Sequence, residues 1–502
     1  MGKLHWIALA LCGVGAPAAA AEPWREASSS HFVIYAQYTP EALQSFANQL
    51  ERFDKALRVL RHLPDDPVGK ANRLTIFVVQ DNAAAAKLAG APRSDIVGFY
   101  RGRAGASVAI MSREKADHWS DATPQIILLH EYAHHFMYRN YPAAYPAWYS
   151  EGFAEFFSTA LFDADGGIEI GAPANHRAYE FAISRHPNIP LMVSDPSNGA
   201  GLSEIELYGY GWLLTHYLTF NDARKGQLTA YLDAINRGRP AREAAIQVFG
   251  DLLRLQREAL TYLSKRHMKV VRLLPAELPT GPVALRELAP SEAEMLPTKI
   301  RAFSADTGSK ETDLVNDARR VAAHWPQDLT VASALAETEL AGGDLTAADT
   351  DAQRVLTADA NALPALLVRA EVALRLAAAS GSTTEKTRLA KLARTFAMRA
   401  NRCDPDHPVP LTLFYRSFAA AGETPSANAV TALTRAHLLA PEDAELRLLL
   451  ATEMIAESKA REARILLTPI AYASHGGAVR KAASALLAKL PAASDPTPTP
   501  AR

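Results

Sequence analysis

The feature that most constrains this chain is a pair of histidines four residues apart, His130 and His134, in the sequence His-Glu-Tyr-Ala-His. Residues four apart lie on one face of an α-helix, so the two imidazoles can point at one position. Thr123 and Pro124 supply a helix start, and the run 126–129 is apolar all round, which predicts a buried helix. Buried imidazoles and a carboxylate are costly unless something compensates for them, and a metal ion does so. The segment therefore predicts a metal site more strongly than a pair of core histidines.

A second acidic segment supplies a third ligand. Glu151 and Glu155 are again four residues apart, and Ser150 is expected to cap their helix. The segment 141–146 contains two prolines and breaks the first helix, so an antiparallel helix pair would bring Glu151 opposite the histidines. Two imidazoles and one carboxylate leave an open position for water, which is the ligand set of a catalytic zinc site. Glu155 is expected to accept a hydrogen bond from a ligating histidine, and the alternative is a solvated carboxylate on the helix face.

The reaction that such a site performs also needs a base. One zinc ion per chain, held by His130, His134 and Glu151, would lower the pKa of its bound water to about 7. Glu131 lies next to the first ligand and faces the same cleft, so it is predicted to take the proton from that water.

Together, HEYAHH and WYSEGFAEFF resemble the gluzincin metallopeptidases, the group that includes thermolysin and the aminopeptidase N-like enzymes. Sixteen residues separate His134 from Glu151, slightly fewer than in the aminopeptidases. The segment that begins at Tyr208 is similar to the YxxGxALLxYL segment of that group, whose first tyrosine stabilises the tetrahedral intermediate. The resemblance assigns this role to Tyr208, and the spacing to Gly211 selects it over Tyr210. It implies a zinc peptidase over residues of about 30–270.

The substrate preference departs from the aminopeptidases. Those enzymes carry a Gly-Ala-Met-Glu-Asn motif on an upstream edge strand, and its glutamate holds the free amine of the substrate. The corresponding segment 98–111 is predicted to form two strands around a glycine-containing turn, and it has no acidic residue. An endopeptidase or a narrow processing enzyme is therefore expected. The alternatives are a catalytically inert gluzincin-like domain on a helical-repeat scaffold that binds protein partners, and a zinc hydrolase with a non-peptide substrate.

The N-terminal segment, the cysteines and the net charge indicate where the protein is located and which partners it has. Residues 1–21 have a positive start, a short apolar run and a small-residue cleavage site, which predicts a secretory signal and a periplasmic or secreted protein. Cys403 would then be the only cysteine, so no disulfide is expected. A net charge of −1 argues against a nucleic-acid partner, and no later segment is long and apolar enough to predict a membrane span.

The segment 22–270 is predicted to be an α+β gluzincin-like catalytic domain, a small mixed sheet plus helices. Alternating or apolar runs predict strands, and apolar residues at helical spacing predict helices. The strands are expected at 31–37, at 74–79 and in the 98–111 hairpin, and the helices at 40–63 and 82–88.

The second half is predicted to be an all-α tetratricopeptide-like solenoid. Prolines crowd the segment 271–300, which predicts a linker. Within 301–490, short motifs recur at expected helix-pair boundaries, at 325–328, 358–361, 404–407 and 440–443. The first two begin 33 residues apart, close to the 34-residue tetratricopeptide period. The next interval is longer, and a loop at 380–384 would explain it. Such repeats expose a concave surface for a protein partner, and the alternative is a non-repeating helical bundle. The tail, 491–502, is predicted to be disordered.

Overall fold

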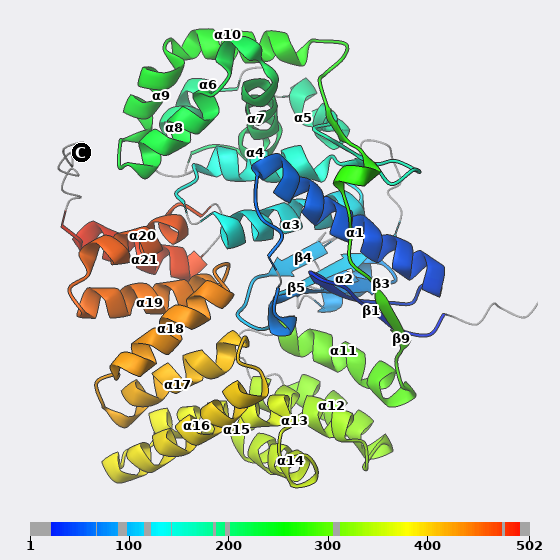
Figure 1. The fold of residues 1–502 in the computed structure, drawn as a ribbon, viewed down its shortest axis with the longest axis vertical. Helices are drawn as coiled ribbons and strands as arrows, with labels where there is room; N and C mark the ends of the chain where they lie inside the picture. Colours follow the sequence, from blue (N-terminus) through cyan, green and yellow to red (C-terminus); the bar gives the residue numbers. More distant parts are fainter. Residues whose placement is uncertain are drawn as a thin grey trace, which may run out of the picture.

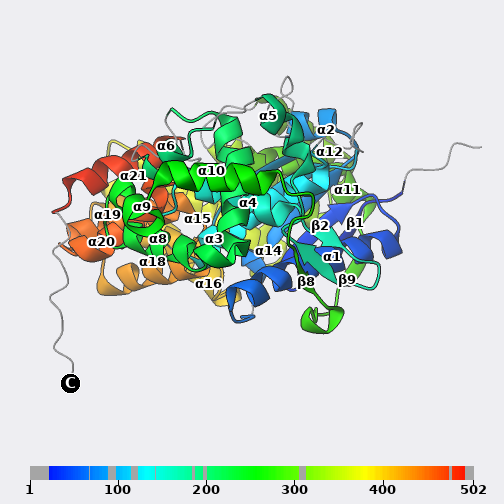
Figure 2. The same cartoon turned by 90° about the horizontal axis from the view of Figure 1, so that it is seen from above.

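The structure is a computed structural model, and it describes residues 22–66, 68–88, 98–114, 122–141, 143–183, 187–195, 201–304, 312–473 and 477–491. The predicted signal segment and all but the first residue of the predicted tail lie outside these ranges. The sheet lies near the middle of the molecule, with a helical lobe on one side and a curved row of helices on the other (Figure 1). Figure 2 shows the same arrangement from above.

The main sheet has six strands in the order β4-β5-β3-β2-β1-β9. The β2, β3 and β5 strands are parallel, and the other neighbours are antiparallel. The strands predicted near 31–37, at 74–79 and in the 98–111 hairpin are all present, so the predicted mixed sheet is confirmed. The strands are β1 (Arg25–Ser28), β2 (Phe32–Ala36), β3 (Leu74–Val79), β4 (Gly98–Arg101), β5 (Val108–Ser112) and β9 (Ala284–Glu287).

Helices cover both faces of this sheet because its central strands bury side chains on both sides. In β3, Ile76 packs with α1 and α3 in one core, and Phe77 packs with α2 and α11 in another. Thr39 caps α1 and accepts a hydrogen bond from the Ala42 amide, as expected at a helix start. These helices are α1 (Pro40–Arg61), α2 (Asn82–Leu88), α3 (Pro124–Asn140) and α11 (Pro290–Ser304).

The helical lobe packs on α3 and contains the helices from α4 to α10. Its central helix, α4 (Ala147–Ser158), contacts both α3 and α7 (Gly211–Phe220). The remaining helices are α5 (Ala178–Ile183), α6 (Ile189–Ser194), α8 (Gln227–Asn236), α9 (Ala241–Phe249) and α10 (Leu252–Leu263), and a second, three-stranded sheet contains β6 (Leu161–Phe162), β7 (Ile168–Ile170) and β8 (Val271–Leu273).

The segment 271–300 differs from the predicted linker. It contains β8, adds β9 to the edge of the main sheet, and begins α11, which covers one face of that sheet. Pro279 and Pro282 lie in the irregular connection between the two strands, and Pro290 begins the helix, all positions where a missing amide N–H is tolerated. Pro297 lies inside α11. The sheet-bearing part therefore continues past residue 270.

From α12 onward the chain is a row of antiparallel helix pairs, and each helix packs mainly on the next (Figure 1). This succession of helix pairs confirms the predicted helical-repeat architecture. The side chains of Asp328 and Asp443, each at the end of a recurring motif, cap α13 and α19. The helices are α12 (Thr312–His324), α13 (Leu329–Ala341), α14 (Leu345–Ala358), α15 (Leu363–Ala379), α16 (Thr383–Cys403), α17 (Pro408–Ala421), α18 (Ala427–Leu439), α19 (Ala444–Ala456), α20 (Ala460–Ala471) and α21 (Gly477–Lys489).

The predicted insertion loop at 380–384 is wrong. The first interval, from the start of α13 to the start of α15, is 34 residues, and the next, to the start of α17, is 45. The connection between α15 and α16 is only 380–382, as short as that between α13 and α14, so the additional residues lengthen the two helices instead. Apolar residues at helical spacing continue through both ends, with Ala377 and Leu389 buried.

Turns between the helix pairs contact the sheet-bearing part. The Arg139 guanidinium at the end of α3 pairs with Glu442 at 3.0 Å, and the Ala104 amide in the β4–β5 hairpin donates to Asp443 at 2.8 Å. Asn72 donates to the carbonyl of Asp406 at 3.1 Å. The solenoid is thus joined to the helix that carries the two histidines and to the neighbouring hairpin. In the described part of the chain, no helix combines the length and the apolarity needed to cross a membrane.

Candidate metal centre

Three metal-binding atoms from α3 and α4 meet in the interior. His130 Nε2 lies 3.1 Å from His134 Nε2, and Glu151 Oε2 lies 3.4 Å from the first and 3.3 Å from the second. All three side chains are buried. Ligands about 2.0–2.2 Å from one tetrahedral ion lie roughly 3.3–3.6 Å apart. The two separations to Glu151 lie in this range and the one between the imidazoles is slightly shorter, so a small movement of the rings would fit a shared metal ion. The structure therefore brings the three predicted ligands to one place.

The antiparallel pairing of α3 and α4 determines which side chains meet. Going down α3, His130 contacts Glu155, His134 contacts Glu151, and the Tyr138 hydroxyl lies 3.2 Å from Ser150 Oγ. Glu155 Oε1 lies 3.2 Å from His130 Nδ1, on the opposite side of the ring from the proposed metal position. Only 1 % of Glu155 is exposed, so the alternative of a solvated carboxylate is wrong.

The expected helix cap at Ser150 is wrong. The helix begins at Ala147, directly after Pro146, so Ser150 lies inside it. The physical reason is packing: Trp148 and Tyr149 are buried, and their place in the first helical turn points them into the core. The Ser150 hydroxyl instead lies 3.5 Å from His134 Nδ1, where it can orient that ring.

The position of Glu151 depends on a close contact between two glycines. A Cβ atom on Gly152 would lie 2.3 Å from the Gly211 carbonyl oxygen, and one on Gly211 would lie 2.6 Å from the Trp148 carbonyl oxygen. At this point α4 and α7 approach so closely that a side chain larger than the hydrogen atom of glycine does not fit between them. The glycine after Glu151 and the one after Tyr210 thus let the two helices approach closely enough for their ends to share one site.

Tyr208 lies beside the histidines, and Tyr210 does not. Tyr208 stands in a π-helical turn, Glu206–Tyr210, directly before α7, and such turns are frequent at functional sites. Its ring stacks on His130, with the ring centres 5.7 Å apart at an angle of 30°. Tyr210 is buried and packs its ring against Phe181.

The electrostatics favour a positive charge at this centre. Burial lowers the pKa of a histidine, yet hydrogen bonds with Glu151 and Glu155 and the charge of Glu131 raise the pKa of His130 to about 10. Burial raises the pKa of the Tyr208 hydroxyl, and the charges of Glu151 and Glu131 raise it further, so the hydroxyl keeps its proton and can donate it in a hydrogen bond. The residues present therefore fit a divalent cation: the donor set is two imidazoles and a carboxylate, and the surroundings are negative.

Two residues of this centre were not foreseen from the sequence. His176 Nε2 lies 2.8 Å from Glu155, and Arg177 pairs with the same carboxylate at 2.6 Å while its guanidinium lies 4.9 Å from the ring centre of Tyr208. Burial alone would raise the pKa of Glu155, but hydrogen bonds from His130, His176 and Arg177 hold it well below its usual range. Both residues belong to a single turn of 3-10 helix, Asn175–Arg177, whose sequence has no motif that would reveal the contact.

The third histidine of the motif has a different partner. His135 is buried, and its Nδ1 lies 2.7 Å from the hydroxyl of Tyr100 on the edge strand β4. Burial lowers the pKa of His135 to about 3, so this ring is neutral. His135 therefore links the helix of the metal centre to the edge strand and is not one of the grouped metal-binding side chains.

Comparison with known proteins finds partial likenesses only. No family model and no curated protein matches the chain. A solved structure described as a thermophilic TPR protein in Thermus thermophilus is 21% identical, with a TM-score of 0.32 over 35% of this chain and 90% of that chain. The MamA RS-1 ArsTM double mutant is 16% identical, with a TM-score of 0.28 over 39% of this chain and 97% of that chain.

Proposed function

We propose that this chain is an exported zinc-dependent metallopeptidase of the gluzincin type. The observation that carries the proposal is the meeting of His130, His134 and Glu151 around one position, with Glu131 on the same helix and Tyr208 beside it. A zinc ion bound there would act as a Lewis acid and supply an activated water at neutral pH. The predicted signal segment is the basis for export.

The side chains of this chain then have distinct roles. Glu131 is half-buried, beside the two ligands, and takes a proton as general base and returns it to the leaving amine. The Tyr208 hydroxyl donates a hydrogen bond to the oxygen on which negative charge develops. Glu155, fixed by His176 and Arg177, accepts the Nδ1 proton of His130 and so directs Nε2 toward the metal position.

Internal cleavage of peptides is the favoured reaction. The edge strand β4 lies against α3, where an extended substrate could add a strand beside it. The segment from β4 to the end of β5 contains arginines at 101 and 103 and no carboxylate, so it offers no counter-ion for a free amino terminus. We further propose that the solenoid binds a protein partner or a protein substrate.

The test is an unbiased library of peptides, half of them blocked at the amino terminus, incubated with the zinc-loaded wild type and with Glu131→Gln. New internal termini in both halves, produced by the wild type alone, are the expected result. Cleavage confined to free amino termini would identify an aminopeptidase instead. No cleavage by the wild type would favour the inert scaffold or a non-peptide substrate.

Tyr208→Phe is expected to bind zinc normally and to turn over about a hundredfold more slowly, because one oxyanion donor is lost. Tyr210→Phe is the matched control, and its rate should stay close to that of the wild type because this ring lies against Phe181. Steady-state kinetics and metal analysis of both variants check the assignment. A slow Tyr210→Phe beside a normal Tyr208→Phe would contradict it.

Glu155→Gln is expected to weaken zinc binding by about ten- to a hundredfold, because the carboxylate no longer orients and polarises His130. Competition with a chromophoric chelator measures the affinity. Glu180→Gln is the control, since Glu180 also pairs with Arg177 but belongs to none of the histidine contacts described above. Equal zinc affinities for the two variants would remove the positioning role of Glu155.

A further inference from the structure

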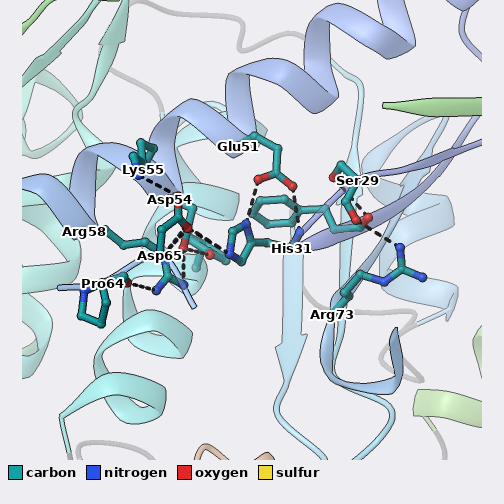
Figure 3. A network of polar contacts seen from close by, with 11 residues as sticks. Ser29, His31, Glu51, Asp54, Lys55, Arg58, Pro64, Asp65 and Arg73 are labelled. Atoms are coloured by element: carbon teal, nitrogen blue, oxygen red, sulfur yellow. Dashed lines mark hydrogen bonds and ion pairs between the residues drawn. The ribbon is translucent and has the colours of Figure 1, made fainter. Parts of the chain in front are cut away.

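A second cluster of metal-binding side chains lies away from the centre described above. His31 precedes β2, Asp54 lies on α1, and Asp65 follows α1. Figure 3 shows the His31 ring between Glu51 on one side and the two aspartates on the other. These groups line a cavity of about 330 Å³ that reaches Thr280 and Gly281.

The His31 ring is held in the orientation of a metal ligand. Its Nδ1 lies 2.8 Å from Glu51 Oε2, and its backbone amide donates to Glu51 Oε1, also at 2.8 Å. A carboxylate on one ring nitrogen fixes the tautomer and leaves the other nitrogen available to a cation. His31 is nine-tenths buried, with 10 % of its side chain exposed, yet Nε2 has no hydrogen-bond partner among the described residues. A buried nitrogen without a hydrogen-bond partner is uncommon, and a bound ion is one of the arrangements that would satisfy it.

Nε2 faces two carboxylate oxygens at distances too long for hydrogen bonds. Asp54 Oδ2 lies 3.6 Å away and Asp65 Oδ1 lies 3.8 Å away. Ligands of one tetrahedral ion lie roughly 3.3–3.6 Å apart, so small side-chain movements would complete the site. Lys55 pairs with the other oxygen of Asp65, and Arg58 Nε lies 3.7 Å from Oδ1, beyond hydrogen-bond distance, so Oδ1 retains lone pairs for a cation. Asp65 is 41% exposed, which gives an entry path.

The charge of the cluster fits a divalent ion. Four carboxylates, Glu51, Asp54, Asp65 and Asp66, line the cavity, and two fixed cations, Lys55 and Arg58, pair with them, which leaves two negative charges when His31 is neutral.

We propose that His31, Asp54 and Asp65 form a second zinc site, distinct from the one on α3 and α4. An imidazole with two carboxylates suits Zn²⁺ better than the oxygen-seeking Mg²⁺ or Ca²⁺. Arg58 uses one lone pair of Asp54 Oδ2, and the other remains for the ion. Tyr132 donates from α3 to Asp54 Oδ1 at 2.7 Å, so this ion would brace α1 against the helix that carries Glu131.

The test is zinc stoichiometry of the chain from residue 22 onward, stripped of metal, reloaded with Zn²⁺ and passed through a desalting column. We expect two zinc ions in the wild type, one in His130→Ala, one in Asp65→Asn, and none in the double variant. Asp66→Asn is the matched control: it removes the same charge from the same cavity and should retain two. Asp65 is partly exposed, so its substitution should not unfold the chain, whereas His31→Ala removes a buried ring.

The outcomes separate this site from the proposed active centre. One zinc in the wild type that is lost in His130→Ala and kept in Asp65→Asn overturns the second site and leaves the peptidase proposal standing. One zinc that is lost in Asp65→Asn and kept in His130→Ala supports the second site and removes the metal from the proposed active centre. Two zinc ions in Asp65→Asn also overturn the inference.

Discussion

Glu131→Gln is expected to keep its zinc and to hydrolyse peptides at least a hundredfold more slowly than the wild type. The amide preserves the size of the side chain but cannot accept a proton, and general bases contribute about 10²–10⁴-fold to such reactions. Glu131 is half-buried and is not one of the three metal-binding side chains, so the metal and the fold should be undisturbed. kcat/KM on the substrate found in the library, together with metal analysis of the same preparation, gives the answer.

The control for this substitution is Glu180→Gln, which removes a nearby carboxylate that pairs with Arg177. Its turnover should stay within a few-fold of the wild type. Full activity in Glu131→Gln would remove Glu131 from the mechanism. Loss of zinc in that variant would show that the side chain holds the metal.

Gly152→Ala is expected to lower the free energy of unfolding by about 3 kcal/mol, the upper end for an overpacked core. The new Cβ would lie 2.3 Å from the Gly211 carbonyl oxygen and 2.5 Å from Thr215 Oγ1, so α4 and α7 must move apart. Glu151 is the neighbouring residue in α4, so zinc affinity should fall with stability. Urea unfolding followed by circular dichroism measures the first effect, and chelator competition measures the second.

The matched control is Gly381→Ala, in the connection between α15 and α16, where an added Cβ would meet nothing within 4 Å. Its stability should remain within about 1 kcal/mol of the wild type. A Gly152→Ala chain as stable as this control would mean that α4 and α7 are not tightly packed.

Features specified by neighbouring residues were predictable from the sequence. Thr123 caps α3 and Pro124 begins it, as predicted, because both act through their own backbone position. The spacing of His130 and His134 placed them on one helical face, and the prolines of 141–146 correctly indicated the reversal that brings Glu151 opposite them. The first repeat interval, 34 residues between the starts of α13 and α15, was also close to the predicted one, because the motifs at helix boundaries are local in sequence.

Features that depend on distant contacts were not predictable. Ser150 has the chemistry of a helix cap, but the burial of Trp148 places the helix start earlier. The proline-rich segment after 270 resembles a linker in composition, yet Pro290 begins α11 and Pro297 lies inside it. The pairing of β9 with β1 joins residues about 260 apart in sequence. Arg177 is a charged residue with no motif, and only the fold brings it to Glu155 and Tyr208.

A crystal of the zinc-loaded chain, with diffraction recorded on both sides of the zinc absorption edge, tests the central claim most directly. The proposal predicts an anomalous peak about 2.0–2.2 Å from His130 Nε2, His134 Nε2 and a carboxylate oxygen of Glu151. The absence of a peak between these three atoms, whether or not zinc is found elsewhere in the molecule, would contradict the proposal.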